Sequence, residues 1–223
     1  AHEATWYLAR LEERRLQTTK ALQLYPSIPA SHARGGEAQI AVARCAESIL
    51  KRLRVLNEPA DQWESAINRW LVTTTAPMLK TDEPLATQHA ELLLLGARIR
   101  LNQTQPNFAG ADQFLDRVLT ATPPETGPEV DAATVTRYTV TAAQQAMARQ
   151  LRIVSLAGTG RVTEAGAILS KAISQGPDQL LVLLDGLSAA TAGQSVALQT
   201  SLGQLQLDAV RRSRIDVTQL PAE

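Results

Sequence analysis

The feature that most constrains this chain is a combination of small residues, bulky apolar residues and a closing proline at helical spacing, which occurs twice. The first copy consists of Leu92, Leu95, Gly96, Ile99, Phe108, Ala111, Leu115, Val118 and Pro123. The second consists of Gly160, Val162, Ala165, Leu169, Ala172 and Pro177. Small residues let two helices approach closely, and proline ends a helix because it has no amide hydrogen to donate. The pattern therefore predicts antiparallel helical hairpins that stack on one another.

The composition favours the same architecture. Hydrophobic residues make up 44% of the 223 residues but aromatic residues only 4%, so the core must consist mainly of alanine, leucine, valine and isoleucine. These residues suit close helix packing. Residues 134–141 are rich in β-branched side chains and could form a strand, but a single strand would have no partner in a sheet. We therefore predict an all-α fold with roughly eight to nine helices.

Prolines and glycines separate the expected helices from one another. The helices cover approximately residues 6–25, 37–56, 59–76, 83–101, 107–120, 130–156, 161–174, 178–191 and 195–214. We expect a single helical-repeat domain over residues 1–223, with core repeats at 37–178, C-terminal helices at 178–214 and a tail at 215–223. Because the chain begins within a helical pattern and without an initiator methionine, we also expect it to be a fragment of a larger protein or a processed product.

Taken together, the two copies resemble the tetratricopeptide repeat (TPR), in which small residues lie at the crossing of two antiparallel helices and a proline ends the second helix. Trp63, Ala66, Trp70 and Thr73 form a weaker third copy. The alanines at 66, 111 and 165 are 45 and 54 residues apart, whereas that family repeats every 34 residues. The resemblance therefore implies an irregular TPR-like solenoid, a right-handed α-α superhelix of helical hairpins.

The resemblance also implies a binding surface, because the ligand of a TPR array lies against the inner face formed by the first helices of the hairpins. Transferred to the matching helices of this chain, that face comprises Lys51, Ala90, Leu93, Ala97, Arg100, Met147, Gln150 and Val154. Such a groove would accept an extended peptide or a helix, with its cations holding polar groups and its apolar residues holding side chains. The alternative is that these residues pack against a neighbouring helix.

Sequence motifs for catalysis or metal binding are missing. The chain has one cysteine, Cys45, and its three histidines, His2, His32 and His89, are far apart in the sequence. The segment 158–160 (Gly-Thr-Gly) is more simply a turn between helices than a phosphate-binding loop. We therefore expect no metal, no cofactor and no enzymatic activity. An enzyme whose site consists of dispersed carboxylates in a helical cleft stays open as an alternative.

The charges give no general attraction to nucleic acid or to an anionic membrane. The chain has 22 basic and 22 acidic residues, so long-range attraction to polyanions is absent. Basic clusters occur at 14–15, 51–54 and 211–214, without interleaved aromatic residues. Solvated helix faces explain them, and nucleic-acid binding is unlikely. No apolar segment approaches the length of a membrane span, so we expect a soluble protein, with a cytoplasmic location favoured.

Together these observations predict a non-enzymatic scaffold that binds a protein or peptide on the concave face of a TPR-like array. A second hypothesis is a structural or self-assembling domain of a larger protein, and a helical enzyme or nucleic-acid-binding module ranks third. A free groove leaves the isolated chain monomeric, whereas a docking face makes it self-associate. The identity of the partner does not follow from the sequence.

Overall fold

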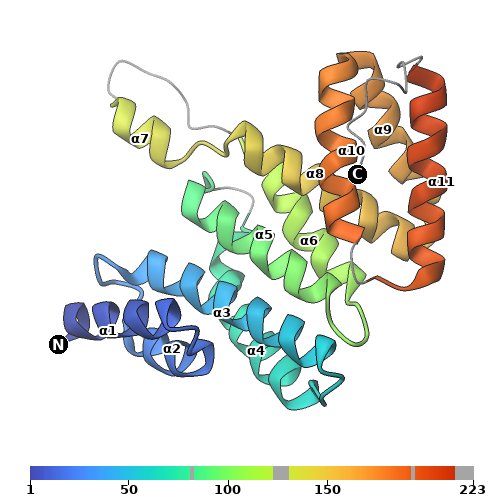
Figure 1. The fold of residues 1–223 in the computed structure, drawn as a ribbon. Coiled ribbons are helices and arrows are strands. Elements are labelled where there is room, and N and C mark those ends of the chain that lie inside the picture. The colour runs from blue at the N-terminus through green and yellow to red at the C-terminus, as the bar shows by residue number, and fades with distance from the viewer. Residues whose placement is uncertain (81–82, 123–130, 192–193, 214–223) are drawn as a thin grey trace. The chain divides into compact units, whose positions relative to one another are not determined.

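The computed structural model describes residues 1–80, 83–122, 131–191 and 194–213, and these residues contain helices and no strand (Figure 1). The predicted all-α class is therefore confirmed for the part of the chain that the structure describes. The chain divides into two compact units, Ala1–Gln144 (unit 1) and Gln145–Glu223 (unit 2). Each unit is described by itself. The expectation of one repeat domain over the whole chain stays a prediction.

The helices follow one another with short connections. Unit 1 contains α1 (His2–Arg14), α2 (Thr18–Leu24), η1 (Tyr25–Ser27), α3 (Gly35–Val55), α4 (Asp61–Thr75), η2 (Ala76–Leu79), α5 (Thr87–Leu101), α6 (Phe108–Leu119) and α7 (Ala132–Arg137). Helix α8 (Ala142–Gly158) crosses the boundary, and unit 2 continues with α9 (Val162–Gln175), α10 (Pro177–Thr191) and α11 (Val196–Ser213). Among these described helices, none combines the length and the apolar character needed to cross a bilayer.

Two of the expected helices are each divided in two. Residues 6–25 were expected to form one helix, but the backbone breaks at Leu16, whose φ of 60° is incompatible with a right-handed helix. Residues 130–156 were also expected to form one helix, and the structure has α7 and α8 separated at residues 138–141. The β-branched stretch is thus part helix and part connection, not a strand. Pro123 and the tail at 215–223 lie outside the described residues.

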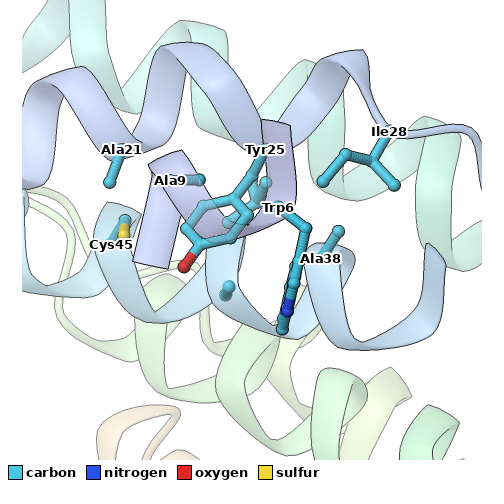
Figure 2. Packing of buried hydrophobic residues seen from close by; sticks show 9 residues of the cluster. Trp6, Ala9, Ala21, Tyr25, Ile28, Ala38 and Cys45 are labelled. Carbon is cyan, nitrogen blue, oxygen red and sulfur yellow. The ribbon is translucent and has the colours of Figure 1, made fainter. Parts of the chain in front are cut away.

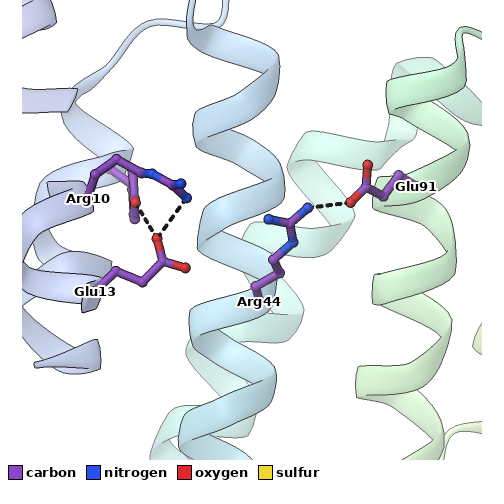
Figure 3. Close-up of polar contacts among 5 residues, drawn as sticks. Arg10, Glu13, Arg44 and Glu91 are labelled. Carbon is purple, nitrogen blue, oxygen red and sulfur yellow. Dashed lines mark hydrogen bonds and ion pairs between the residues drawn. The ribbon is translucent and has the colours of Figure 1, made fainter. Parts of the chain in front are cut away.

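The N-terminal part of unit 1 has a compact apolar cluster, which Figure 2 shows. It consists of Trp6, Ala9, Ala21, Tyr25, Ile28, Ala38, Ala41, Val42 and Cys45. The Tyr25 hydroxyl donates to Glu13 Oε2 over 2.7 Å, and Arg10 lies 3.3 Å from the same carboxylate oxygen (Figure 3). Burial and the Glu13 charge raise the pKa of Tyr25. This cluster ties α1 and α2 to the first half of α3.

Helices α3 and α5 pack along their lengths and are joined by ion pairs. Arg44 on α3 lies 2.6 Å from Glu91 on α5 (Figure 3). One helical turn further along α3, Glu47 lies 2.7 Å from Arg98 of α5 and 3.0 Å from Lys51 of its own helix. The Glu47 side chain is only 9% exposed, so these contacts stabilise a carboxylate that would be costly to bury alone.

The hairpin α5–α6 closes around Gly96, as the small-residue pattern predicts. A Cβ atom on Gly96 would lie 2.8 Å from Phe114 Cε2, so any larger residue would force the helices apart. The Arg100 guanidinium stacks on the Phe114 ring at 4.0 Å from its centroid and donates to the Gly110 carbonyl oxygen over 2.7 Å. Figure 1 shows α5 between α3 and α6, so it has packed neighbours on two sides.

Unit 2 is held by apolar stripes at helical spacing. Its buried residues include Ala165, Leu169 and Ala172 on α9, Leu180, Leu183 and Leu187 on α10, and Leu198, Leu202, Leu205 and Ala209 on α11. The turns before and after α9 contain Gly160 and Gly176, whose φ values of 78° and 117° favour glycine. The segment at 158–160 is therefore a turn between two helices.

Candidate functional site

The eight residues predicted for the inner face occupy different environments. In unit 1, Ala90, Leu93 and Ala97 are fully buried within α5, and Arg100 is 7% exposed and stacked on Phe114. The side chains therefore pack against neighbouring helices, which is the alternative that the sequence left open. Their role in binding a ligand stays a prediction.

The other four predicted residues include the exposed ones. Lys51 is exposed and pairs with Glu47. In unit 2, Met147 is 38% exposed, Val154 is fully buried, and Gln150 is half-buried and donates to the Val182 carbonyl oxygen over 3.0 Å. Because the two groups of residues belong to different units, the structure does not assemble them into one surface.

A different concavity lies within unit 1 and is the candidate functional site. It is a partly open cleft of about 630 Å³, a size typical of ligand sites. Several elements contribute to it: the connection before α3, the end of α4, η2, the start of α5, α6 and the end of α7. Its polar and charged lining residues include Gln39, Lys80, Glu83, His89, Arg117 and Arg137. We refer to it below as the unit 1 cleft.

One side of the unit 1 cleft is held by Arg117. This side chain extends from α6 and is buried, with 5% of the residue exposed. Its Nε donates to the Met78 carbonyl oxygen over 3.1 Å, and its Nη2 donates to the Glu83 carbonyl oxygen over 2.5 Å. Charge-assisted hydrogen bonds of this kind are stronger than neutral ones. A single cation thus fixes the backbone on both flanks of Lys80.

The opposite side is held by the first turn of α5. The Thr87 hydroxyl lies 3.1, 3.0 and 2.8 Å from the carbonyl oxygens of residues 136, 137 and 139 and donates toward them. Gln144 Nε2 in turn donates to the Thr87 carbonyl oxygen over 2.9 Å. These contacts dock the end of α7 on α5, and they place Arg137 and Tyr138 at the cleft.

The charges of the cleft are mainly positive. Its lining contains Lys80, Arg117 and Arg137 against a single carboxylate, Glu83. Partial desolvation, and then the neighbouring charge of Arg137, lower the pKa of His89. His89 is therefore neutral at physiological pH and acts as a hydrogen-bonding group.

A second imidazole lines the same cleft. His32 Nδ1 accepts a hydrogen bond from the Arg34 backbone N–H over 3.1 Å, so the proton of a neutral His32 is on Nε2. Its ring also lies edge-on to His2, with 5.7 Å between the centroids. Among the residues that the structure describes, no group of three or more His, Cys, Asp or Glu side chains could hold a metal ion. The cleft thus has groups that bind and orient a ligand.

The sequence did not indicate this cleft because its residues come from segments that are far apart. Lys80, Arg117 and Arg137 belong to no motif. One signal was present for Arg117: it follows Phe114 by three positions, on the apolar side of an otherwise amphipathic helix. An arginine at such a position is usually paired and structural.

The fold and the cleft define the chain as an all-helical protein whose hairpins enclose a polar concavity. Comparison of the chain with models of protein families, with curated proteins and with solved structures found no match.

Proposed function

We propose that this chain is a non-enzymatic interaction module that binds a protein or peptide, with its hairpins arranged in the TPR-like right-handed superhelix that the sequence resembles. The observation that carries the proposal is the unit 1 cleft, whose two sides are each held by hydrogen bonds while Lys80 and Arg137 are exposed. Binding is strengthened when polar groups are already positioned before the ligand arrives.

The contact between α5 and α6 supports the TPR-like part of the proposal. Gly96 and Ala111 are the small residues of the first sequence copy, and Gly96 meets Phe114 where the two helices cross. Close approach at small residues is the main feature that the chain shares with that family.

We assign ligand contact to the unit 1 cleft in place of the buried part of the predicted inner face. Substitution of Leu93 or Arg100 would test folding, since both are buried and tightly packed. Lys51 and Met147 are exposed and remain candidates for further contacts.

The experiment is quantitative affinity capture with the purified full chain, combined with light scattering. A monomeric chain that retains one protein, and loses it to an excess of untagged chain, is the expected result. A chain that retains no competable partner at any salt concentration would contradict the proposal.

A structural, self-assembling role is the second candidate, and one surface of α1 favours it. Tyr7, Leu8 and Leu11 are 61%, 46% and 42% exposed, and they lie at helical spacing on one side of α1. If this face docks a second copy, light scattering will detect a dimer that Leu8→Ser and Leu11→Ser dissociate. A wild-type chain that stays monomeric at high concentration excludes this role.

A further inference from the structure

We infer that the unit 1 cleft binds an acidic peptide segment, whose carboxylates pair with Lys80 and Arg137. The inference rests on the proposed binding function and specifies the chemistry of the partner. It follows from which cations of the cleft are already engaged, from the shape and lining of the cleft, and from how its two sides are held.

The first step is to separate engaged from available charge. Arg117 is buried and already donates to two backbone carbonyl oxygens, so its role is to hold the wall. Lys80 and Arg137 line the same cleft and are exposed. Within the described part of the chain, neither of them forms an ion pair, so both can accept an external carboxylate.

Arg137 is oriented for this task. Its guanidinium lies 5.8 Å from the centroid of the Tyr138 ring. Stacking uses the face of a guanidinium, and its N–H groups then point outward in the plane, where a carboxylate can accept two hydrogen bonds. Because Thr87 holds the carbonyl group of Arg137, little backbone ordering is needed when the ligand binds.

The remaining lining fits an extended chain. Gln39 and Gln88 contribute side-chain amides, and Ser31 and Thr74 contribute hydroxyls, all of which can pair with a peptide backbone. Met78 and Leu85 add apolar surface for aliphatic side chains. The cleft is partly open, so a segment of a longer chain can enter and leave it.

A nucleic acid fits the same cleft less well. Strand binding without sequence preference uses a long cationic groove with several stacking aromatic residues. Apart from the two imidazoles, the described lining of the cleft has one aromatic side chain, Tyr138. The chain as a whole has no net charge, so an acidic peptide is the better match.

The test is a selection from a random peptide library displayed on phage, followed by anisotropy measurements with selected synthetic peptides. The variants are Lys80→Glu and Arg137→Glu. Their matched controls are Lys20→Glu and Arg14→Glu, which reverse exposed cations of unit 1 outside the cleft. Circular dichroism and thermal melting establish that each variant is folded.

We expect the selected peptides to be enriched in Asp and Glu. Each cleft reversal should weaken their binding about tenfold, while the controls change it less than about twofold. The double variant Lys80→Glu, Arg137→Glu should prefer a peptide in which the acidic residues are replaced by lysine. Added salt should weaken binding to the wild type.

Two results would overturn the inference, and they are distinct from failure of the proposed function. Selected peptides without acidic enrichment would refute the ligand chemistry, although the chain would still be a binding module. Equal losses in the cleft and control variants would show that binding depends on overall charge and not on the cleft. Failure of both peptide selection and partner capture would remove the proposed function as well.

Discussion

The two units are both all-helical, but they bury different kinds of side chain. Of the described residues, the buried charged ones are Glu47, Arg100 and Arg117, and all three lie in unit 1. The helices α9, α10 and α11 of unit 2 are packed through leucine and alanine stripes. A buried charge requires partners at fixed positions, whereas apolar contacts tolerate small displacements. Polar contacts therefore define the geometry of unit 1, and the candidate site lies beside one of them.

The largest expected effect concerns Cys45, which probes the packing of unit 1 alone because it is the single cysteine of the chain. Burial raises the pKa of the Cys45 thiol to about 11, and only the thiolate reacts. At pH 8 the native thiol should react with an aromatic disulfide reagent at least about a hundredfold more slowly than the urea-unfolded chain. Similar rates in both states would show that the core of unit 1 opens freely.

Truncation of the hairpin core in unit 1 should have the next largest effect. Phe114 is fully buried, contacts Gly96 and lies under the Arg100 guanidinium. Phe114→Ala should lower the free energy of unfolding by about 4 kcal/mol, because it leaves a cavity and removes the aromatic partner of a buried cation. Urea denaturation measures this loss. The exposed Met147→Ala is the control, and a loss equal to that of the control would disprove tight packing at this crossing.

Replacement of the buried cation should separate the two units most directly. Arg117→Met keeps most of the side-chain volume but leaves the carbonyl oxygens of Met78 and Glu83 without these donors. We expect a loss of about 2 to 3 kcal/mol and faster proteolysis between α4 and α5. Unchanged stability together with unchanged proteolysis would mean that polar contacts do not hold this side of the cleft.

The corresponding substitution in unit 2 should be much milder. Leu169 is fully buried on α9 and makes apolar contacts. Leu169→Met conserves the volume and should lower the free energy of unfolding by no more than about 1 kcal/mol. Thermal unfolding of this variant and of Arg117→Met, measured side by side, compares the units. A larger loss for Leu169→Met would reverse the contrast between them.

The smallest effect should come from an exposed ion pair. Arg44 and Glu91 are 2.6 Å apart, but their side chains are 50% and 40% exposed. Glu91→Gln should therefore change the free energy of unfolding by no more than about 0.5 kcal/mol, and less in high salt. Urea denaturation at low and high salt checks this. A loss above that of Leu169→Met would mean that the edge of the α3–α5 contact is more important than its packed centre.

Much of the helical architecture could be predicted from local patterns. Prolines and glycines divided the chain close to the observed ends of α3, α4, α5, α6, α9 and α10. The breaks near Leu16 and at 138–141 were missed, because neither contains the proline or glycine that usually marks a break. A positive φ at leucine depends on the packing of both flanking helices, and a local pattern does not contain that information.

The candidate site depended more on tertiary structure. The apolar periodicity of α5 suggested that Ala90, Leu93 and Ala97 lie on one face, but periodicity cannot say whether that face meets solvent or another helix. The structure places neighbours on two sides of α5, and these side chains are buried. Lys80 and Arg137 carried no sequence signal, since each is a single cation in a connecting region or at a helix end.

The sequence by itself determined that the chain is helical, where most helices end, and that small residues lie at the helix crossings, because these properties depend on backbone sterics and on side chains a few positions apart. Only the tertiary structure decided which helix faces are covered and which cations meet at a cleft. Those properties depend on contacts between residues far apart in the chain, such as Arg117 with Met78 and Thr87 with Thr139. Such contacts form only when the helices pack.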